Sequence, residues 1–245
     1  MNVRRWNLKA DFDMDREYDC VVLTYNVKHK KTYDTLCLLK AKGYHKVLVW
    51  ATPFTYVKKF HPIFEHRPEM IVDIDTERLC KNFGFDYRLS KSGYDELKVS
   101  QDTPVLVCGA GLIPDDFIKK YKVINSHPGY IPLARGLDAL KWAIHDNVAI
   151  GATTHIIGDE IDAGEIIERR EIPVYINDTF HALSQRVYDN EIDMLVRTLE
   201  LLDEKHTYIS AQGEEAHKRM PPEIEKNLMM NFENYKIKYA VDRLS

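Results

Sequence analysis

Short β-branched runs alternate with amphipathic stretches along this chain, and that alternation limits the fold more than any other feature. The predicted strands lie at residues 20–25, 46–51, 70–74, 104–108 and 122–125. The predicted helices have apolar residues at helical spacing and span residues 32–42, 76–83, 114–121 and 137–146. Alternating strands and helices predict an α/β fold, a doubly wound and mostly parallel sheet with helices on both faces.

The later part of the chain predicts two more strands and a long helix. Residues 150–157 and 165–174 indicate a pair of strands, expected to be antiparallel and joined by an acidic turn. Asn177 or Asp178 is expected to cap a helix over residues 179–203. The apolar stripe of this helix consists of Phe180, Leu183, Val187, Ile192, Leu195, Leu199 and Leu202.

After Glu204 the composition becomes polar and rich in lysine and glutamate. We therefore expect residues 1–204 to form one Rossmann-like domain and residues 205–245 to form a small C-terminal appendage. This extension is either an appended helix or an oligomer contact.

Charge and composition exclude several classes of protein. The 245 residues include 34 Lys and Arg against 38 Asp and Glu, a net charge of −4 that gives no basic field for nucleic acid. No apolar run approaches the roughly 20 residues that span a bilayer, and Met1 to Asp15 lack a secretory signal. We expect a cytoplasmic protein without a membrane or nucleic-acid partner. The four cysteines form no CxxC pair and are expected to be reduced and buried.

Two polar residues suited to proton transfer stand at the end of the strand at 122–125. Alternation along a strand places Asn125 and His127 on the same side. Asparagine offers a neutral amide donor, and histidine can hold or release a proton near neutral pH. Residues 158–164 form a tight acidic turn, and an aspartate there can meet His127 across a cleft.

Each of these features taken alone has a simpler interpretation. A lone histidine is more often a surface or core residue, and an acidic turn is more often a solvated hairpin. His127, His155 and Asp162 have the residue types of a metal site, but the sequence contains no HExxH motif or cysteine cluster to support one. We therefore expect no metal.

The order and spacing of several segments together resembles the formyltetrahydrofolate-dependent formyltransferases. These segments are Leu112-Ile113-Pro114, Asn125 to Gly129, Ile131-Pro132, Arg135-Gly136, Trp142-Ala143-Ile144, Gly151 to His155 and Asp162 to Ile167. The likeness covers about Val105 to Leu202, and before residue 100 it is limited to the strand and helix alternation. The resemblance implies a sheet of the formyltransferase type, a catalytic role for residues 1–204, and 10-formyltetrahydrofolate as co-substrate.

The resemblance also implies that Asn125, His127 and Asp162 match the family's catalytic residues. An amine must attack a formamide-like carbon, and both Asn125 and His127 can donate to the oxyanion that forms. Asp162 can orient His127 and, through a water, help to move the proton. We expect His155 to support the acidic turn rather than to react. The residues that the resemblance places around the folate are Leu112, Ile113, Gly158, Asp159, Ile161 and Asp162, with the loop 129–136 as a cover.

The first hundred residues bear on which amine is formylated. Glycinamide ribonucleotide transformylases carry a glycine- and serine-rich phosphate loop after the first strand, but residues 26–32 here contain no glycine. This basic loop is either an anion site that uses His29 and Lys30 or a solvated lysine run. Methionyl-tRNA formyltransferases carry an extra RNA-binding domain, and this chain is too short and too acidic for that role.

The stretch from Pro132 to Ile144 is most similar to the sugar-nucleotide N-formyltransferases, which act in surface polysaccharide (O-antigen) synthesis. We therefore expect the acceptor to be a dTDP-linked amino-deoxy sugar, with dTDP-4-amino-4,6-dideoxyglucose as the first candidate. The expected acceptor-binding residues are His29, Lys30, Arg135 and Gly136. Three alternatives stay open: glycinamide ribonucleotide as acceptor, a hydrolase that passes the formyl group to water, and a folate-binding module without turnover. A homodimer is a family-level expectation.

Overall fold

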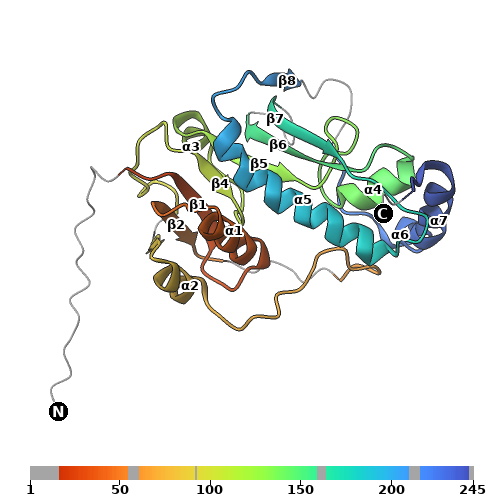
Figure 1. Cartoon of the computed structure of the whole chain (residues 1–245), viewed down its shortest axis with the longest axis horizontal. Coiled ribbons are helices and arrows are strands. Elements are labelled where there is room, and N and C mark those ends of the chain that lie inside the picture. The colour runs from red at the N-terminus through yellow and green to blue at the C-terminus, as the bar shows by residue number, and fades with distance from the viewer. Residues whose placement is uncertain (1–16, 55–60, 92, 159–163, 210–215, 243–245) are drawn as a thin grey trace, which may run out of the picture.

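A computed structural model describes residues 17–54, 61–91, 93–158, 164–209 and 216–242. The described strands form a single sheet in the order β3-β2-β1-β4-β5-β6-β7-β8 (Figure 1). Their bounds are β1 Cys20–Tyr25, β2 Val47–Thr52, β3 Asp86–Leu89, β4 Val105–Val107, β5 Val123–His127, β6 Gly151–Ile157, β7 Gly164–Glu171 and β8 Thr207–Ile209. The five strands β3, β2, β1, β4 and β5 pair in parallel with their neighbours in this order. Strands β6, β7 and β8 then pair antiparallel.

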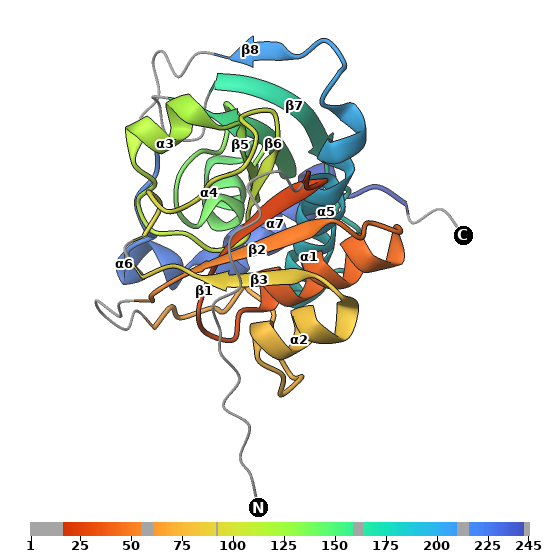
Figure 2. The same cartoon turned by 90° about the vertical axis from the view of Figure 1, so that its left-hand side faces the viewer.

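Helices cover both faces of the sheet (Figure 2). Their bounds are α1 Lys30–Ala41, α2 Thr76–Phe83, α3 Asp115–Lys120, α4 Ala139–Asp146, α5 Phe180–Leu201, α6 Pro222–Glu225 and α7 Leu228–Tyr239. On one face, residues of α1, α2 and α5 pack against β1, β2 and β5 in one hydrophobic cluster. On the other face, residues of α3 pack against β1, β2, β4 and β5. The predicted α/β fold with a mostly parallel, doubly wound sheet is confirmed.

Strands β1 and β2 form the centre of this core because both of their faces are covered. Almost every residue of these two strands is buried, which explains their continuous apolar runs. The predicted strand at 70–74 was wrong: these residues lie outside the sheet, and Ile71 is 95% exposed. The third strand of the first half is instead β3, at the edge beside β2. Its polar sequence suits an edge and carries no alternating apolar signal.

Helix α5 begins one residue later than its expected caps. Thr179, and neither Asn177 nor Asp178, is the N-cap, and its hydroxyl accepts a hydrogen bond from the Ala182 amide at 3.1 Å. The carboxylate of Asp178 instead receives two hydrogen bonds from the Arg186 guanidinium, each of 2.8 Å. Because both oxygens of Asp178 are engaged with Arg186 of the helix, Thr179 supplies the cap instead.

The C-terminal segment joins both the sheet and a hydrophobic cluster. Strand β8 pairs with β7, and Leu228, Phe232 and Tyr235 of α7 pack with residues of α4 and α5. Fully buried Lys141 of α4 forms an ion pair with buried Glu225 of α6. The Glu225 carboxylate also accepts hydrogen bonds of 3.1 Å from the amides of Ile63 and Phe64. One carboxylate therefore connects α4, α6 and the segment that follows β2.

We expect Lys141→Met to lower the free energy of unfolding by about 3–5 kcal/mol, because it leaves the Glu225 charge buried without its partner. Urea unfolding of the whole chain measures this change. The double variant Lys141→Met with Glu225→Gln should recover part of the loss, since it removes the orphaned charge and keeps an oxygen for one of the two amides. A single variant as stable as the wild type would contradict a structural role for the pair.

Candidate active site

Strand β5 positions the two polar residues that the sequence singled out. The first two residues of this strand, Val123 and Ile124, belong to clusters on opposite faces of the sheet. Val123 lies on the α3 side and Ile124 on the α5 side. Asn125 and His127 follow Val123 at two-residue spacing and so face the α3 side. His127 is buried and Asn125 is half-buried. The two side chains therefore stand on one face at the carboxyl end of β5.

The loop after β5 folds back over His127. The His127 Nε2 lies 2.9 Å from the Ala134 carbonyl oxygen, which can only accept, so Nε2 donates this hydrogen bond. Gly129 permits the close approach, because a Cβ there would lie 2.2 Å from that oxygen and 2.6 Å from Nε2. The Thr153 hydroxyl donates to the Gly129 carbonyl at 2.8 Å and accepts from the Ile131 amide at 3.1 Å. This loop thus fixes the tautomer and orientation of the His127 ring.

Strand β6 adds a second histidine to the same face. His155 is paired with Asn125, and Thr153 is paired with His127, in the antiparallel ladder between β5 and β6. Directly opposite residues of such a ladder share a face, so the buried His155 ring is a cross-strand neighbour of Asn125. The acidic turn that we expected His155 to support lies mostly outside the described residues.

Among the residues expected around the folate, Asp159, Ile161 and Asp162 lie outside the described residues. Ile113, in the loop after β4, and Ile157, at the end of β6, pack in one cluster on the α3 side, where Asn125 and His127 also face. Leu112 is 97% exposed, and no atom of the described residues other than its chain neighbours lies within 4 Å of where a Cβ of Gly158 would stand. An aromatic ring system beside Leu112 would remove an apolar side chain from water. The placement of Leu112, Ile113 and Gly158 around a folate co-substrate stays a prediction.

The Arg135-Gly136 step is held by the C-terminal segment. The His217 amide donates to the Arg135 carbonyl at 3.0 Å, and the Leu137 amide donates to the His217 carbonyl at 2.8 Å. Gly136 has φ +83°, and a Cβ there would lie 2.2 Å from the His217 oxygen. The His217 ring also stacks on Trp142, with centroids 4.4 Å apart. Arg135 is buried. Backbone pairing with His217 thus sets the position of Arg135 and Gly136, two of the four residues expected to bind the acceptor.

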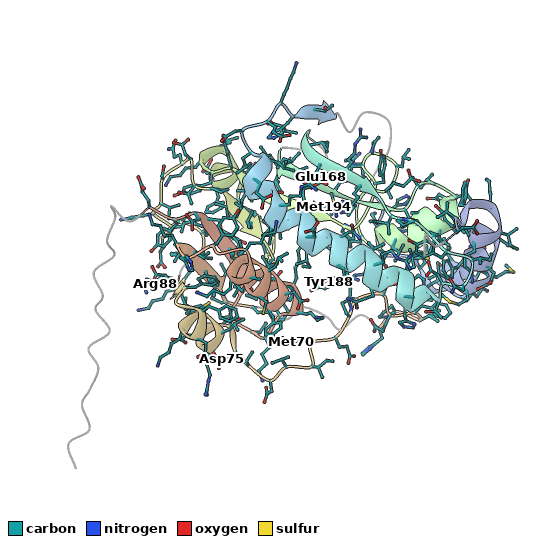
Figure 3. The ribbon with its side chains drawn as sticks, viewed as in Figure 1. Met70, Asp75, Arg88, Glu168, Tyr188 and Met194 are labelled. Atoms are coloured by element: carbon teal, nitrogen blue, oxygen red, sulfur yellow. The ribbon has the colours of Figure 1, made fainter. Side chains whose placement is uncertain are left out.

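The basic loop after β1 is engaged with its own surroundings. Lys30 forms an ion pair of 2.8 Å with Asp34 and lies over the ring of Tyr188, which Figure 3 labels on α5. The His29 Nδ1 lies 3.0 Å from the Thr32 hydroxyl. Burial, together with the charges of Lys31 and Arg67, lowers the pKa of His29 to about 4, so the ring is neutral near pH 7.

A buried glutamate with two cationic partners lies beside this loop and was missed by sequence reasoning. Glu191 is 1% exposed in the middle of α5, with Lys31 Nζ at 2.8 Å and Arg67 Nη1 at 2.7 Å from its two oxygens. Lys31 also donates to the Ser126 carbonyl at 3.1 Å, between Asn125 and His127. A signal was present: positions 187, 191 and 195 follow four-residue spacing, so Glu191 is a charge within the apolar stripe.

The charge of Glu191 is maintained by its partners. Burial alone would raise the pKa of this carboxyl, but Arg67 and Lys31 outweigh burial and hold the pKa at about 2. Glu191 is therefore ionised at neutral pH and balances only one of the two cations.

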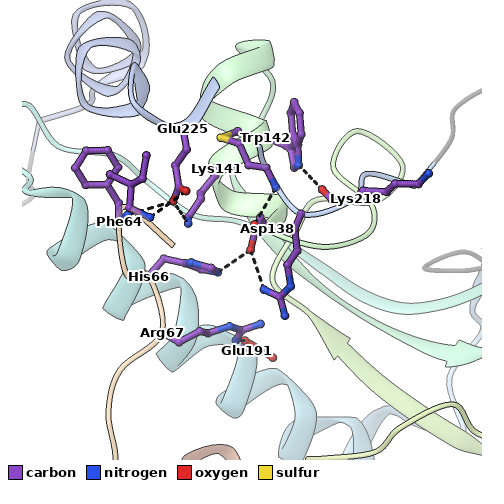
Figure 4. Close-up of polar contacts among 12 residues, drawn as sticks. Phe64, His66, Arg67, Asp138, Lys141, Trp142, Glu191, Lys218 and Glu225 are labelled. Carbon is purple, nitrogen blue, oxygen red and sulfur yellow. Dashed lines mark hydrogen bonds and ion pairs between the residues drawn. The ribbon is translucent and has the colours of Figure 1, made fainter. Parts of the chain in front are cut away.

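Arg67 belongs to a segment, residues 61–75 between β2 and α2, that we name the strap. Figure 4 shows the polar contacts of the strap with α4, α5 and α6. Beside Arg67, the His66 Nε2 lies 3.8 Å from an Asp138 oxygen that also lies 3.8 Å from Arg219. Burial, with Arg67 and Lys141 nearby, lowers the pKa of His66 to about 4. The strap thus brings one neutral histidine and one charged arginine to the carboxyl edge of the parallel strands.

Comparisons with known proteins identify the segment that carries Asn125 and His127. Residues 89–199 match the family model described as formyl transferase. This segment is a formyl transferase domain. A trifunctional purine biosynthetic protein adenosine-3 from Gallus gallus is 36% identical over 103 residues, which are 40% of this chain and 10% of that protein. The chain thus matches only about a tenth of the length of that curated relative.

Two solved structures share the fold of the domain at low identity. A 4-N formyltransferase from Francisella tularensis has a TM-score of 0.53 and 19% identity, over 79% of this chain and 73% of that one. A phosphoribosylglycinamide formyltransferase from Anaplasma phagocytophilum also has a TM-score of 0.53 and 19% identity, over 76% of this chain and 87% of that one. The formyl transferase fold is therefore common to chains named for different acceptors.

The described ranges contain neither a metal-binding cluster nor a membrane-spanning helix. Within them, no cluster of three or more His, Cys, Asp and Glu side chains is arranged to bind a metal ion. None of the helices in those ranges combines the length and apolar character that crossing a bilayer requires.

We expect Glu191→Gln to lower the free energy of unfolding by about 3 kcal/mol near pH 7, because Lys31 and Arg67 lose their shared counter-charge. A carboxyl whose folded pKa is about 2 against an ordinary 4.5 stabilises the fold above that ordinary value and loses this effect as pH falls towards 2. The difference between wild type and variant should therefore shrink between about pH 5 and about pH 3 in urea unfolding.

The matched control is Glu200→Gln, on the same helix and paired with Lys42 but 53% exposed. It should change the unfolding free energy by less than about 1 kcal/mol. Equal losses of unfolding free energy in the two variants would show that burial of the Glu191 ion pairs does not increase their contribution to stability.

Proposed function

We propose that this chain transfers a formyl group from 10-formyltetrahydrofolate to the amine of a dTDP-linked amino-deoxy sugar, with dTDP-4-amino-4,6-dideoxyglucose as the acceptor to test first. The observation that carries the chemistry is the pair Asn125 and His127 on one face of β5, inside a formyl transferase domain. An amide donor and an imidazole at the carboxyl end of a parallel strand suit attack on a formamide-like carbon.

In this proposal each polar residue has one role. The amine nitrogen bonds to the formyl carbon, the bond from that carbon to the folate nitrogen breaks, and the proton of the amine moves to the leaving nitrogen. The Asn125 amide donates to the oxygen as negative charge develops on it. His127, whose ring is held by the Ala134 carbonyl, stabilises the same developing oxyanion. Asp162, through a water, helps to move the proton from the amine to the leaving nitrogen.

The choice of acceptor depends on the loop after β1 and on the strap. Residues 26–32 contain no glycine, so the backbone cannot cradle a phosphate monoester as a glycine-rich loop does. Side chains such as Arg67 suit a phosphate that lies further from the backbone. A second candidate acceptor, glycinamide ribonucleotide, is favoured by the 36% identity to a purine biosynthetic protein.

We expect Asn125→Ala and His127→Ala each to lower kcat by roughly a hundredfold or more, since each removes a group that acts on the reacting carbon. Steady-state kinetics with a fixed acceptor measures the change, and the KM for 10-formyltetrahydrofolate should stay near the wild-type value. Ser126→Ala is the matched control, because Ser126 lies between them and faces the α5 side of the sheet. Wild-type rates in both alanine variants would exclude the proposed mechanism.

We expect formylation of the dTDP-linked amino sugar and none of glycinamide ribonucleotide. Incubation of each acceptor with 10-formyltetrahydrofolate, followed by mass spectrometry, detects the added formyl group. Efficient formylation of glycinamide ribonucleotide alone would overturn the acceptor and leave the chemistry in place. Release of formate without any acceptor would indicate a hydrolase, and binding of folate without turnover would indicate a binding module.

A further inference from the structure

We propose that Arg67 of the strap is the receptor for a phosphate group of the acceptor, a site that depends on the proposed function and makes it more specific. The strap follows β2, helix α1 with Lys31 in its first turn follows β1, and Asn125 and His127 end β5. Ligands of open α/β sheets bind outside the carboxyl ends of the parallel strands, where these three segments meet.

The guanidinium of Arg67 is fixed on one side and accessible on the other. Its Nη1 is 2.7 Å from a Glu191 oxygen, and Glu191 is buried while the Arg67 side chain is 47% exposed. An arginine carries five N–H donors, and a single carboxylate contact leaves most of them available among the described residues. A planar donor group that is already held in place loses less rotamer entropy when it binds a phosphate.

The charges around Arg67 favour an anion. Arg67 and Lys31 share the single negative charge of Glu191, whose low pKa keeps that charge in place at neutral pH. By contrast, Lys30 and Lys28 each have a carboxylate of their own, Asp34 and Asp73. The cluster of Lys31, Arg67 and Glu191 therefore keeps one surplus positive charge, whereas Lys28 and Lys30 are each balanced by one carboxylate.

This surplus charge is coupled to the strand that carries the reacting groups. Lys31 donates to the Ser126 carbonyl at 3.1 Å, so the cluster touches the backbone between Asn125 and His127. Lys31 and Glu191 lie on the α1 and α5 side of the sheet and Asn125 faces the α3 side. An acceptor whose phosphate contacts Arg67 must therefore extend across the carboxyl edge of β5 to present its amine to Asn125. His29 and His66 flank Arg67 as neutral rings near pH 7, because both pKa values are lowered to about 4. They offer hydrogen bonds without adding charge.

The kinetic test compares three variants of the whole chain. Arg67→Ala should raise the KM for the phosphate-bearing acceptor by roughly tenfold or more, through loss of a charge-assisted hydrogen bond, and leave the KM for 10-formyltetrahydrofolate unchanged. Arg67→Lys should give an intermediate KM, since it keeps the charge and loses the planar fork. The control is Arg197→Ala, which removes an arginine of equal exposure (46%) with one carboxylate neighbour, Glu168, and should leave both KM values unchanged.

A binding test separates this inference from the proposed function. Calorimetric titration with dTDP and with ribose 5-phosphate requires no formyl transfer and distinguishes a diphosphate from a monoester. Binding of either compound to the wild type and a tenfold or greater loss in Arg67→Ala support the receptor, even where no amino sugar is formylated. The proposal is overturned where neither compound binds the wild type, where Arg67→Ala binds both equally well, or where that variant raises the KM for folate instead. Should Arg67→Ala fail to fold, the titrations use Arg67→Lys: a smaller but measurable loss of binding supports the receptor, and binding equal to that of the wild type overturns it.

Discussion

Glu191 lies in the middle of α5 and holds together parts of the chain that are far apart in sequence. Its carboxylate contacts Lys31 at the start of α1 and Arg67 on the strap, 160 and 124 residues away. Through Lys31 it also reaches the Ser126 carbonyl on β5. A charge buried beneath the sheet edge is stable only with such partners, so the positions of the strap, α1 and the end of β5 are coupled.

A second set of contacts orders the loop over His127 from the C-terminal side. The strap amides of Ile63 and Phe64 and the ammonium of Lys141 all converge on Glu225. The Arg135-Gly136 step pairs with His217, and the Asp138 carboxylate accepts from the Met220 amide at 3.0 Å. The first turn of α4 and the residue before it are therefore held in place by contacts with α6 and with the segment before α6, and α6 is in turn held by the strap.

The sequence was most informative where burial is continuous or where a residue pattern is local. Strand β1 and helix α2 have the predicted bounds, since a doubly covered strand and an aspartate-capped helix both leave clear local patterns. The position of Asn125 and His127 on one strand follows from alternation alone. Edge strand β3 and the cap of α5 were missed, because an edge strand lacks a buried face and Asp178 is diverted by Arg186. The contact between Arg67 and Glu191 joins residues that no local pattern relates.

The pairing of Gly136 with His217 has a consequence for the order of synthesis. The loop that orients His127 precedes its partner by about 80 residues of chain, so a nascent domain has its strands β1 to β8 before that partner exists. The loop over His127 can acquire its final surroundings only when the segment around residue 217 has emerged from the ribosome and paired with the backbone around Gly136. Completion of the reactive site is thus delayed until strand β8 and the segment after it have been made.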